Sequence, residues 1–214
     1  MHDLLHGWIV TWFSWVRDWG YAGVILLMAM ESSILPVPSE IVIPPAAYWA
    51  TQGRMSLVGV VVAGTIGSYI GATIMYFVSL RFGRPFLLRY GKWFFVSPEK
   101  LERAERFLAR YETGGVFFAR LLPVVRHLIG IPAGIVRMRF LPYSIATIVG
   151  SAIWCSVLAW FGQDVLGSQP KLLEDPDAMI SALKAKSLPI LGAVLLLLAL
   201  YVLVVKLTDK KSAA

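Results

Sequence analysis

The chain has 214 residues, of which 57% are hydrophobic and 15% charged, whereas a soluble domain usually carries about 25% charged residues. Its net charge is +7; residues 81–110 hold eight of the 20 basic residues, and Lys206, Lys210 and Lys211 lie near the C-terminus. This composition excludes an ordinary soluble domain, and the clustered basic residues favour cytoplasmic loops of an integral membrane protein over a nucleic-acid surface.

The first predicted element is an interfacial helix over residues 1–19. Trp8, Trp12, Trp15 and Trp19 are spaced by 4, 3 and 4 residues and so line one face of a helix. Tryptophan rings favour the interface between membrane and water. The segment lacks a basic start and an Ala-x-Ala cleavage site, so we expect it to be retained rather than removed as a signal peptide.

Residues 20–54 are predicted to form a re-entrant helical hairpin. Two apolar runs, each about half the length needed to cross a ~30 Å hydrocarbon core, flank a break that contains Glu31, Pro36, Pro38 and Glu40. The two prolines shape the tip, because each removes a backbone donor and interrupts a helix. Irregular backbone at membrane depth must face protein or water, so we expect a polar cavity at this tip.

Residues 56–82 form the first full-length apolar span, and residues 97–112 then become charged and amphipathic. The span carries a face of small residues suited to close helix contact: Gly64, Gly67, Ser68 and Gly71. The basic residues that follow it place its C-terminal end in the cytoplasm. Residues 97–112 are predicted to be a helix on the cytoplasmic surface, with Glu102 and Arg106 as an i,i+4 pair.

Residues 116–138 repeat the pattern of the first hairpin with the opposite charge. Arg120 and Arg126 flank Pro123. Pro132 and Gly134 follow and are expected to shape the returning limb. We therefore predict a second re-entrant hairpin whose two arginines converge at its tip.

Two further transmembrane helices are predicted over residues 140–166 and 188–206, with the C-terminal tail in the cytoplasm. Residues 65–70 resemble residues 147–153 with one inserted residue, and each segment follows a charged, proline-broken hairpin. The charge rule sends the first span inward and the second outward. The predicted fold is therefore all-α and polytopic, an inverted repeat of hairpin plus transmembrane helix, as in many transporters.

Four charges in these apolar segments carry the functional prediction: Glu31, Glu40, Arg120 and Arg126. Each costs roughly 2.5–3.5 kcal/mol at the membrane centre, so a chain that keeps them is expected to use them. Arginine suits phosphate, because its planar guanidinium presents forked donors and stays charged. Burial raises the pKa of a carboxyl group and a nearby arginine lowers it, so the acids are candidates for ion pairing or proton coupling. A static cluster that only joins the hairpins is the structural alternative.

Catalysis, a cofactor and a bound metal are not expected. An intramembrane phosphatase of the phosphatidic-acid type would need two active-site histidines in separated motifs, but His2 and His6 lie at the N-terminal end. His127 beside Arg126 is a candidate accessory proton carrier, or part of the wall of a polar cavity. The sequence contains no Gly-x-Ser-x-Gly elbow, metal-ligand cluster or Walker loop.

These motifs resemble the DedA family, part of the wider group that shares the VTT or SNARE-associated domain. The resemblance covers roughly residues 20–167 and rests on three motifs: Glu31 with residues 36–40, residues 118–126, and residues 131–134 with Met138. It implies a bacterial inner-membrane protein with two opposed re-entrant hairpins. It also implies translocation of undecaprenyl phosphate or of a phospholipid such as phosphatidylethanolamine. The family's essential acids correspond to Glu31 and Glu40, and its essential arginines to Arg120 and Arg126.

Three functions follow from this reading. The first is a proton-coupled translocase of undecaprenyl phosphate, in which the arginines bind the phosphate and the acids compete for them. The second is an energy-independent phospholipid scramblase. The third, of a different class, is a membrane scaffold that transports nothing. The sequence leaves open the lipid, the coupling ion and the oligomeric state, with a homodimer as one option.

Overall fold

The computed structural model describes residues 11–12, 14–33, 38–90, 98–122 and 125–166, together with Gly192 and Ala199. Throughout these residues the regular elements are helices, as expected for an all-α protein. The transmembrane helix predicted over 188–206 lies outside the described residues apart from those two positions. Pro36, Pro123 and Trp8 also lie outside the described residues, so the predictions made for them stay predictions.

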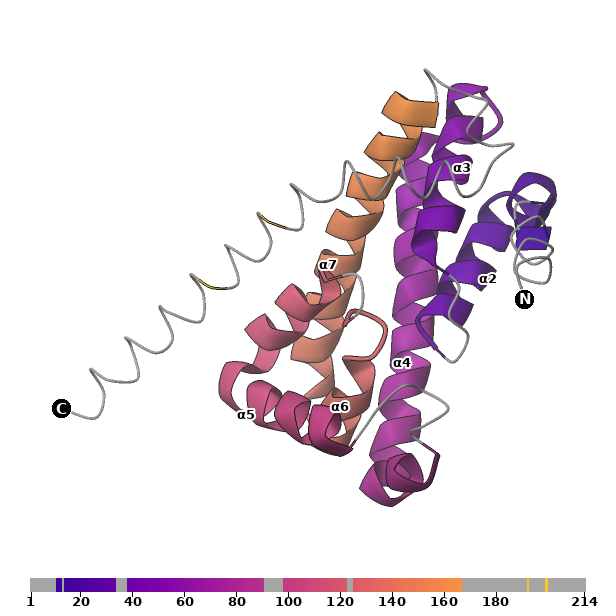
Figure 1. The fold of residues 1–214 in the computed structure, drawn as a ribbon. Helices are drawn as coiled ribbons and strands as arrows, with labels where there is room; N and C mark the ends of the chain where they lie inside the picture. The colour runs from indigo at the N-terminus through magenta and orange to yellow at the C-terminus, as the bar shows by residue number, and fades with distance from the viewer. Residues whose placement is uncertain are drawn as a thin grey trace.

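The first half of the chain contains a pair of short helices and one long helix (Figure 1). The helices are α2 (Tyr21–Glu31), α3 (Ser39–Thr51) and α4 (Leu57–Tyr90). After α2 the chain reverses, and α3 begins directly after Pro38, whose extended backbone occupies the cap position. Helix α4 bends at Gly83, where φ is 62°. Its apolar part, Leu57–Gly83, is long enough to cross a membrane.

The second half repeats this order with a kinked first helix. Its elements are α5 (Pro98–Arg120), α6 (Gly130–Ile135) and α7 (Phe140–Phe161), which continues into the π-helical turn η2 (Gly162–Leu166). Helix α5 is interrupted at Glu112, where φ is 41° and ψ is −123°, so its parts before and after this residue are two helical segments that meet at a kink. The segment Phe140–Asp164 is the second helix long and apolar enough to cross a membrane.

Before its kink, α5 is amphipathic. Leu108 and Tyr111 are buried, whereas Glu102 and Arg106 are exposed and form the predicted i,i+4 ion pair at 3.0 Å. Such an exposed pair contributes a few tenths of a kcal/mol at most, so the buried side of the helix supplies most of its attachment.

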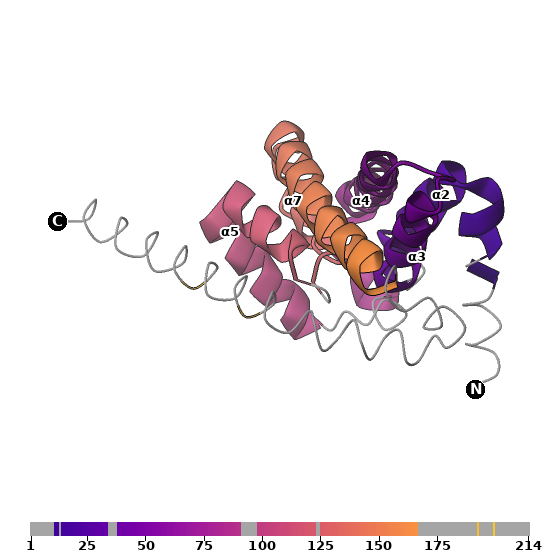
Figure 2. The same cartoon turned by 90° about the horizontal axis from the view of Figure 1, so that it is seen from above.

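The long helices α4 and α7 run antiparallel and form the centre of the fold. Two contacts fix this direction: the Tyr69 hydroxyl lies 3.1 Å from Ser144 Oγ, and the Tyr143 hydroxyl donates to the carbonyl of Ala72. Seen from above, α5 and the α2–α3 pair lie on opposite sides of this central pair (Figure 2).

The shorter helices pack on the central pair in a reciprocal way. Helix α2 packs on α4 and α5 packs on α7, each within its own half. Helix α6 crosses to pack on α4, while α3 crosses to pack on α7 and η2. Exchanging the two halves therefore maps these contacts onto one another.

Glycines allow several of these helices to touch backbone to backbone. A Cβ atom added at Gly71 in α4 would lie 2.3 Å from the carbonyl oxygen of Ala29 in α2. At Gly134 in α6 it would lie 2.3 Å from the carbonyl oxygen of Tyr76 in α4. Of the small-residue face predicted on the first span, Gly67 and Gly71 contact α2, whereas Gly64 faces α3 and α7.

The outer faces of the central helices are apolar and exposed. On α4 and α7 they present stripes of large side chains, among them Val58, Val62, Ile66, Ile74, Leu141, Ile145 and Trp160. Contiguous apolar stripes of this extent suit lipid rather than water. At the N-terminal end, Trp19 is exposed and stacks on Trp15, whereas Trp12 and Trp15 pack against the core.

The glycine contact between α2 and α4 is expected to be intolerant of a single methyl group. Gly71→Ala would force the two backbones apart, so we expect the melting temperature of the detergent-purified protein to fall by roughly 2–10 °C. Gly59→Ala on the same helix is the matched control, because the atoms nearest to its Cβ belong to the outer end of the exposed Tyr21 ring, which can shift at the cost of its hydrogen bond with the Ser56 N–H. A Gly71→Ala protein as stable as the wild type by differential scanning fluorimetry would contradict this packing.

Candidate functional site

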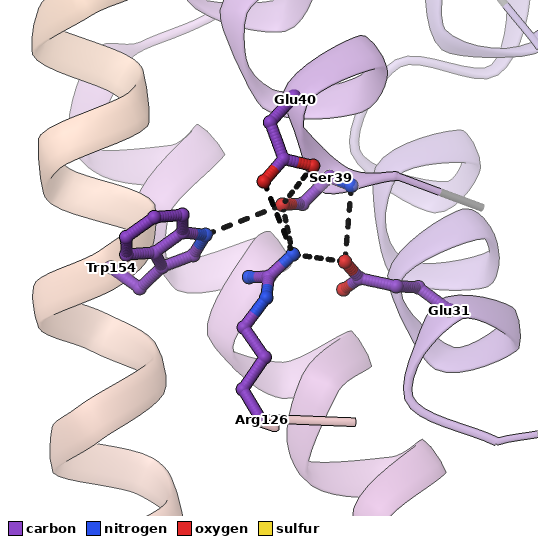
Figure 3. Close-up of polar contacts among 5 residues, drawn as sticks. All are labelled: Glu31, Ser39, Glu40, Arg126 and Trp154. Atoms are coloured by element: carbon purple, nitrogen blue, oxygen red, sulfur yellow. Dashed lines mark hydrogen bonds and ion pairs between the residues drawn. The ribbon is translucent and has the colours of Figure 1, made fainter. Parts of the chain in front are cut away.

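Arg126 is the centre of a buried polar cluster (Figure 3). It lies in the turn between α5 and α6 and is only 6% exposed. Its guanidinium donates hydrogen bonds to the Glu31 carboxylate and to Ser39 Oγ. It also lies 3.9 Å from Glu40 Oε1 and 5.0 Å from the centroid of the Trp154 ring. The cation is thus surrounded by two acids, a hydroxyl and an aromatic face.

The two acids are held at the start of helix α3. Glu31 ends α2, and its Oε1 accepts a hydrogen bond of 3.0 Å from the backbone N–H of Ser39, the first residue of α3. Glu40 occupies the first turn of the same helix. The first N–H groups of a helix lack internal partners and carry partial positive charge, so this position favours carboxylates. The proline-broken hairpin therefore places both acids where Arg126 reaches them.

Ser39 and Trp154 join three parts of the fold around this cluster. The Ser39 hydroxyl, which is fully buried, accepts hydrogen bonds from Arg126 and from Trp154 Nε1, the latter at 3.3 Å. It lies 3.4 Å from Glu40 Oε2, to which it donates. The indole of Trp154 on α7 also faces the guanidinium, which adds a cation–π attraction. Helices α3 and α7 and the α5–α6 turn thus meet at one point.

Arg120 has quite different surroundings, although it is equally buried. It ends α5 with 2% exposure, and its Nη2 lies 3.4 Å from the Tyr143 hydroxyl, which donates at 2.9 Å to the Ala72 carbonyl. No carboxylate of the described residues forms an ion pair with it, and its Nε is buried without a hydrogen-bond partner. A buried cation without a counterion is costly, so this side chain needs an explanation.

A narrow polar pocket connects the two arginines. Its walls are formed by Glu31, Ser32, Ser68, Arg120, Arg126, Ser151 and Trp154. In this conformation the space between these side chains is too small to admit a water molecule. The pocket lies at the tip of the first hairpin, where the sequence led us to expect a polar cavity, and it is lined from both halves of the chain.

The structure brings some of the predicted site residues into contact and leaves others apart. Glu31 and Glu40 meet Arg126, whereas Arg120 lines the same pocket without pairing with either acid. His127 is half-buried, with its Nδ1 lacking a partner. Of the residues expected to shape the hairpins, Pro38 caps α3, and Pro132 and Gly134 are buried in α6.

The sequence reading missed four contributors to the cluster: Ser39, Trp154, Tyr143 and Ser32. Ser39 stands inside the motif at residues 36–40 and Trp154 directly follows the segment 147–153, but nothing in their spacing shows that residues 115 positions apart share a hydrogen bond. Among the described residues, no three His, Cys, Asp or Glu side chains lie together as a metal site requires.

Comparison with known proteins identifies relatives of this chain. Residues 37–164 match the family model described as the VTT domain. Undecaprenyl phosphate transporter A of Bacillus subtilis is 36% identical over 73% of this chain and 76% of its own length. Undecaprenyl phosphate transporter A of Staphylococcus aureus is 31% identical over 75% of this chain and 80% of its own length. An alkaline phosphatase-like protein of Lactococcus lactis is 34% identical over 69% of this chain and 71% of its own length.

No solved structure matches the chain. The family match nevertheless covers more than half of the chain and contains every residue of the Arg126 cluster except Glu31. On these grounds, and with the resemblance of its paired hairpin motifs, the chain belongs to the DedA family of VTT-domain membrane proteins.

Proposed function

We propose that this protein is a lipid transporter that moves the phosphate headgroup of undecaprenyl phosphate across the bacterial inner membrane. The observation that carries the proposal is the pair of buried arginines on one pocket, of which Arg120 has no acidic partner among the described residues. Two relatives of the chain are named as transporters of this lipid, which supports the same substrate here.

The chemistry of the pocket suits a phosphate. Arginine binds phosphate through forked, charge-assisted hydrogen bonds, which are strong where water is excluded. Arg120 supplies a buried cation with an unused Nε–H donor. A headgroup at this point would provide the missing counterion and so offset the desolvation of the guanidinium. The long isoprenyl tail would stay in lipid, beside the exposed apolar faces of α4 and α7.

Arg126 would take part by exchanging partners. While it is bound to Glu31 and Ser39 and close to Glu40, its Nη2 donors and its charge are engaged by the protein, and only its Nε lacks a partner. Protonation of the acids would weaken their hold and release the guanidinium to a phosphate. Loss of the proton from the acids would then restore the ion pair and expel the headgroup. This exchange is our proposal for coupling transport to protons.

The closed pocket requires the hairpins to separate before a headgroup can enter. We propose that α2–α3 and the second hairpin, from the end of α5 through α6, are opposed re-entrant hairpins related by an inverted repeat. The antiparallel central helices and the reciprocal packing of the shorter helices support this relation. Two halves of opposite orientation allow one site to open to either side of the membrane in turn. We place the amphipathic part of α5 at the cytoplasmic surface.

We infer a role without catalysis, although one relative is named an alkaline phosphatase-like protein. Hydrolysis needs a nucleophile beside a general base. Within the described part of the chain, the Ser39 oxygen accepts hydrogen bonds from Arg126 and Trp154, so its lone pairs are not free for attack, and its contact with the Glu40 carboxylate is long at 3.4 Å. We infer that the Ser39 hydroxyl holds the Arg126 guanidinium in place.

Removal of the Arg120 charge is expected to abolish transport while leaving the fold intact. Arg120→Gln should lower the flip rate of a fluorescent polyprenyl phosphate in proteoliposomes at least roughly 30-fold, since a buried charged contact to the phosphate is lost. The melting temperature should stay near that of the wild type, because no ion pair is broken. A variant that flips the lipid at the full rate would refute the proposal.

Arg126 should behave differently, because its removal leaves Glu31 buried without a cation. Arg126→Gln is expected to destabilise the protein by about 3–5 kcal/mol. Adding Glu31→Gln should recover most of this loss in thermal unfolding, whereas transport should remain lost in both variants. If the double variant regained transport, Arg126 would be a structural residue only.

Proton coupling is tested by the dependence of transport on a pH gradient. In wild-type proteoliposomes, dissipation of the gradient with nigericin should slow the flip rate, whereas Glu31→Gln should be insensitive to it. Glu102→Gln, which changes an exposed acid on α5, serves as the control and should keep the wild-type response. A wild-type rate that does not depend on the gradient would leave an energy-independent scramblase as the better description.

A further inference from the structure

Two serines of the pocket occupy matching places in the two halves of the chain. Ser68 on α4 and Ser151 on α7 are both buried, and both line the pocket with Arg120 and Arg126. Each directly follows a glycine in the repeated segments at 65–70 and 147–153. The mechanism given above uses neither serine.

The glycine before each serine is a point of close helix contact. A Cβ atom added at Gly67 would lie 2.4 Å from the Ile25 carbonyl oxygen of α2. One added at Gly150 would lie 2.6 Å from the Cβ of Arg120, at the end of α5. In each half, the glycine therefore admits the first hairpin helix, and the next residue along the long helix places a hydroxyl at the pocket.

The hydroxyls of Ser68 and Ser151 are distinguished by their place on the pocket. Thr65 on α4 and Ser156 on α7 each donate to the carbonyl four residues earlier, at 2.7 Å and 2.8 Å, whereas neither Ser68 nor Ser151 has a hydrogen-bond partner among the described residues. Thr73 and Thr147 on the same helices are buried without a partner as well, but they do not line the pocket. The two serine hydroxyls are therefore unused donors that a ligand in the pocket could reach and satisfy with acceptors.

We propose that Ser68 and Ser151 bind terminal oxygens of a phosphomonoester headgroup, one from each half of the protein, while Arg120 supplies the charge. This inference rests on the proposed function and deepens it, because it names two further residues that would bind the phosphate. A phosphomonoester presents three terminal oxygens, which match the guanidinium and two hydroxyl donors. Because each half contributes one serine, the headgroup keeps one hydroxyl contact whichever side of the membrane the pocket opens to.

The test measures binding of farnesyl phosphate, and of farnesol as the ligand without phosphate, to the full-length protein by isothermal titration calorimetry. Ser68→Ala and Ser151→Ala should each weaken binding of farnesyl phosphate by roughly 3- to 10-fold, and the double variant by roughly 10- to 100-fold. Farnesol binding should not change. Ser79→Ala, a buried serine on α4 away from the pocket, and Ser156→Ala on α7 are the matched controls and should bind as the wild type does.

The outcomes separate this inference from the proposed function. If Arg120→Gln loses farnesyl phosphate and the serine variants do not, the serines are not ligands and the proposed function stands. If the serine variants weaken farnesol and farnesyl phosphate equally, their effect is structural and the inference is wrong. If the wild type does not distinguish the phosphate from the alcohol, the proposed function fails and the serine assignment fails with it.

Discussion

The Arg126 guanidinium, held between two carboxylates of the first hairpin, is the contact on which the remaining structure depends. Taking these charges out of water costs several kcal/mol for each ion, and good geometry is needed to recover that cost. The geometry comes from elements far apart in the sequence: the end of α2, the start of α3, the α5–α6 turn and an indole on α7. Arg126 cannot be satisfied unless both halves are folded against each other, so the charged cluster and the tertiary fold form together.

The two arginines have different partners, and we infer that this difference governs how the site would bind and release a ligand. Arg126 is paired with carboxylates of the protein, whereas Arg120 has only a long contact to the Tyr143 hydroxyl, and the Nε of each lacks a partner. In the proposed mechanism, the cation without an acidic partner would attract the headgroup. The carboxylates beside the other cation would compete with the headgroup and so favour its release.

The sequence predicted the parts of this site better than it predicted their connections. The apolar runs, the prolines at Pro36 and Pro38 and the four charges were sufficient to anticipate an all-helical protein with two long apolar helices and charged breaks. The sequence did not reveal which acid meets which arginine, because that depends on how the hairpins cross between the halves. The roles of Ser39 and Trp154 were hidden for the same reason, since hydrogen bonds across 115 residues leave no periodic signal. The sharp kink at Glu112, between the two helical segments of α5, was also not predicted, because it needs a positive φ at a residue that is not glycine.

The helix contacts are repeated in the two halves of the fold, whereas the charges are not, and we infer that this difference affects how such a protein changes conformation. The helix contacts are reciprocal: each long helix packs on the first helix of its own half and on the second of the other, and each presents a glycine followed by a serine. In an arrangement of this kind, exchange of the halves would give a second conformation with the same pattern of helix contacts. The charges do not follow this pattern, because the acids lie in the first half and the bases in the second. The ion pair would then favour one conformation, and a ligand or proton that removes it would shift the population between the two.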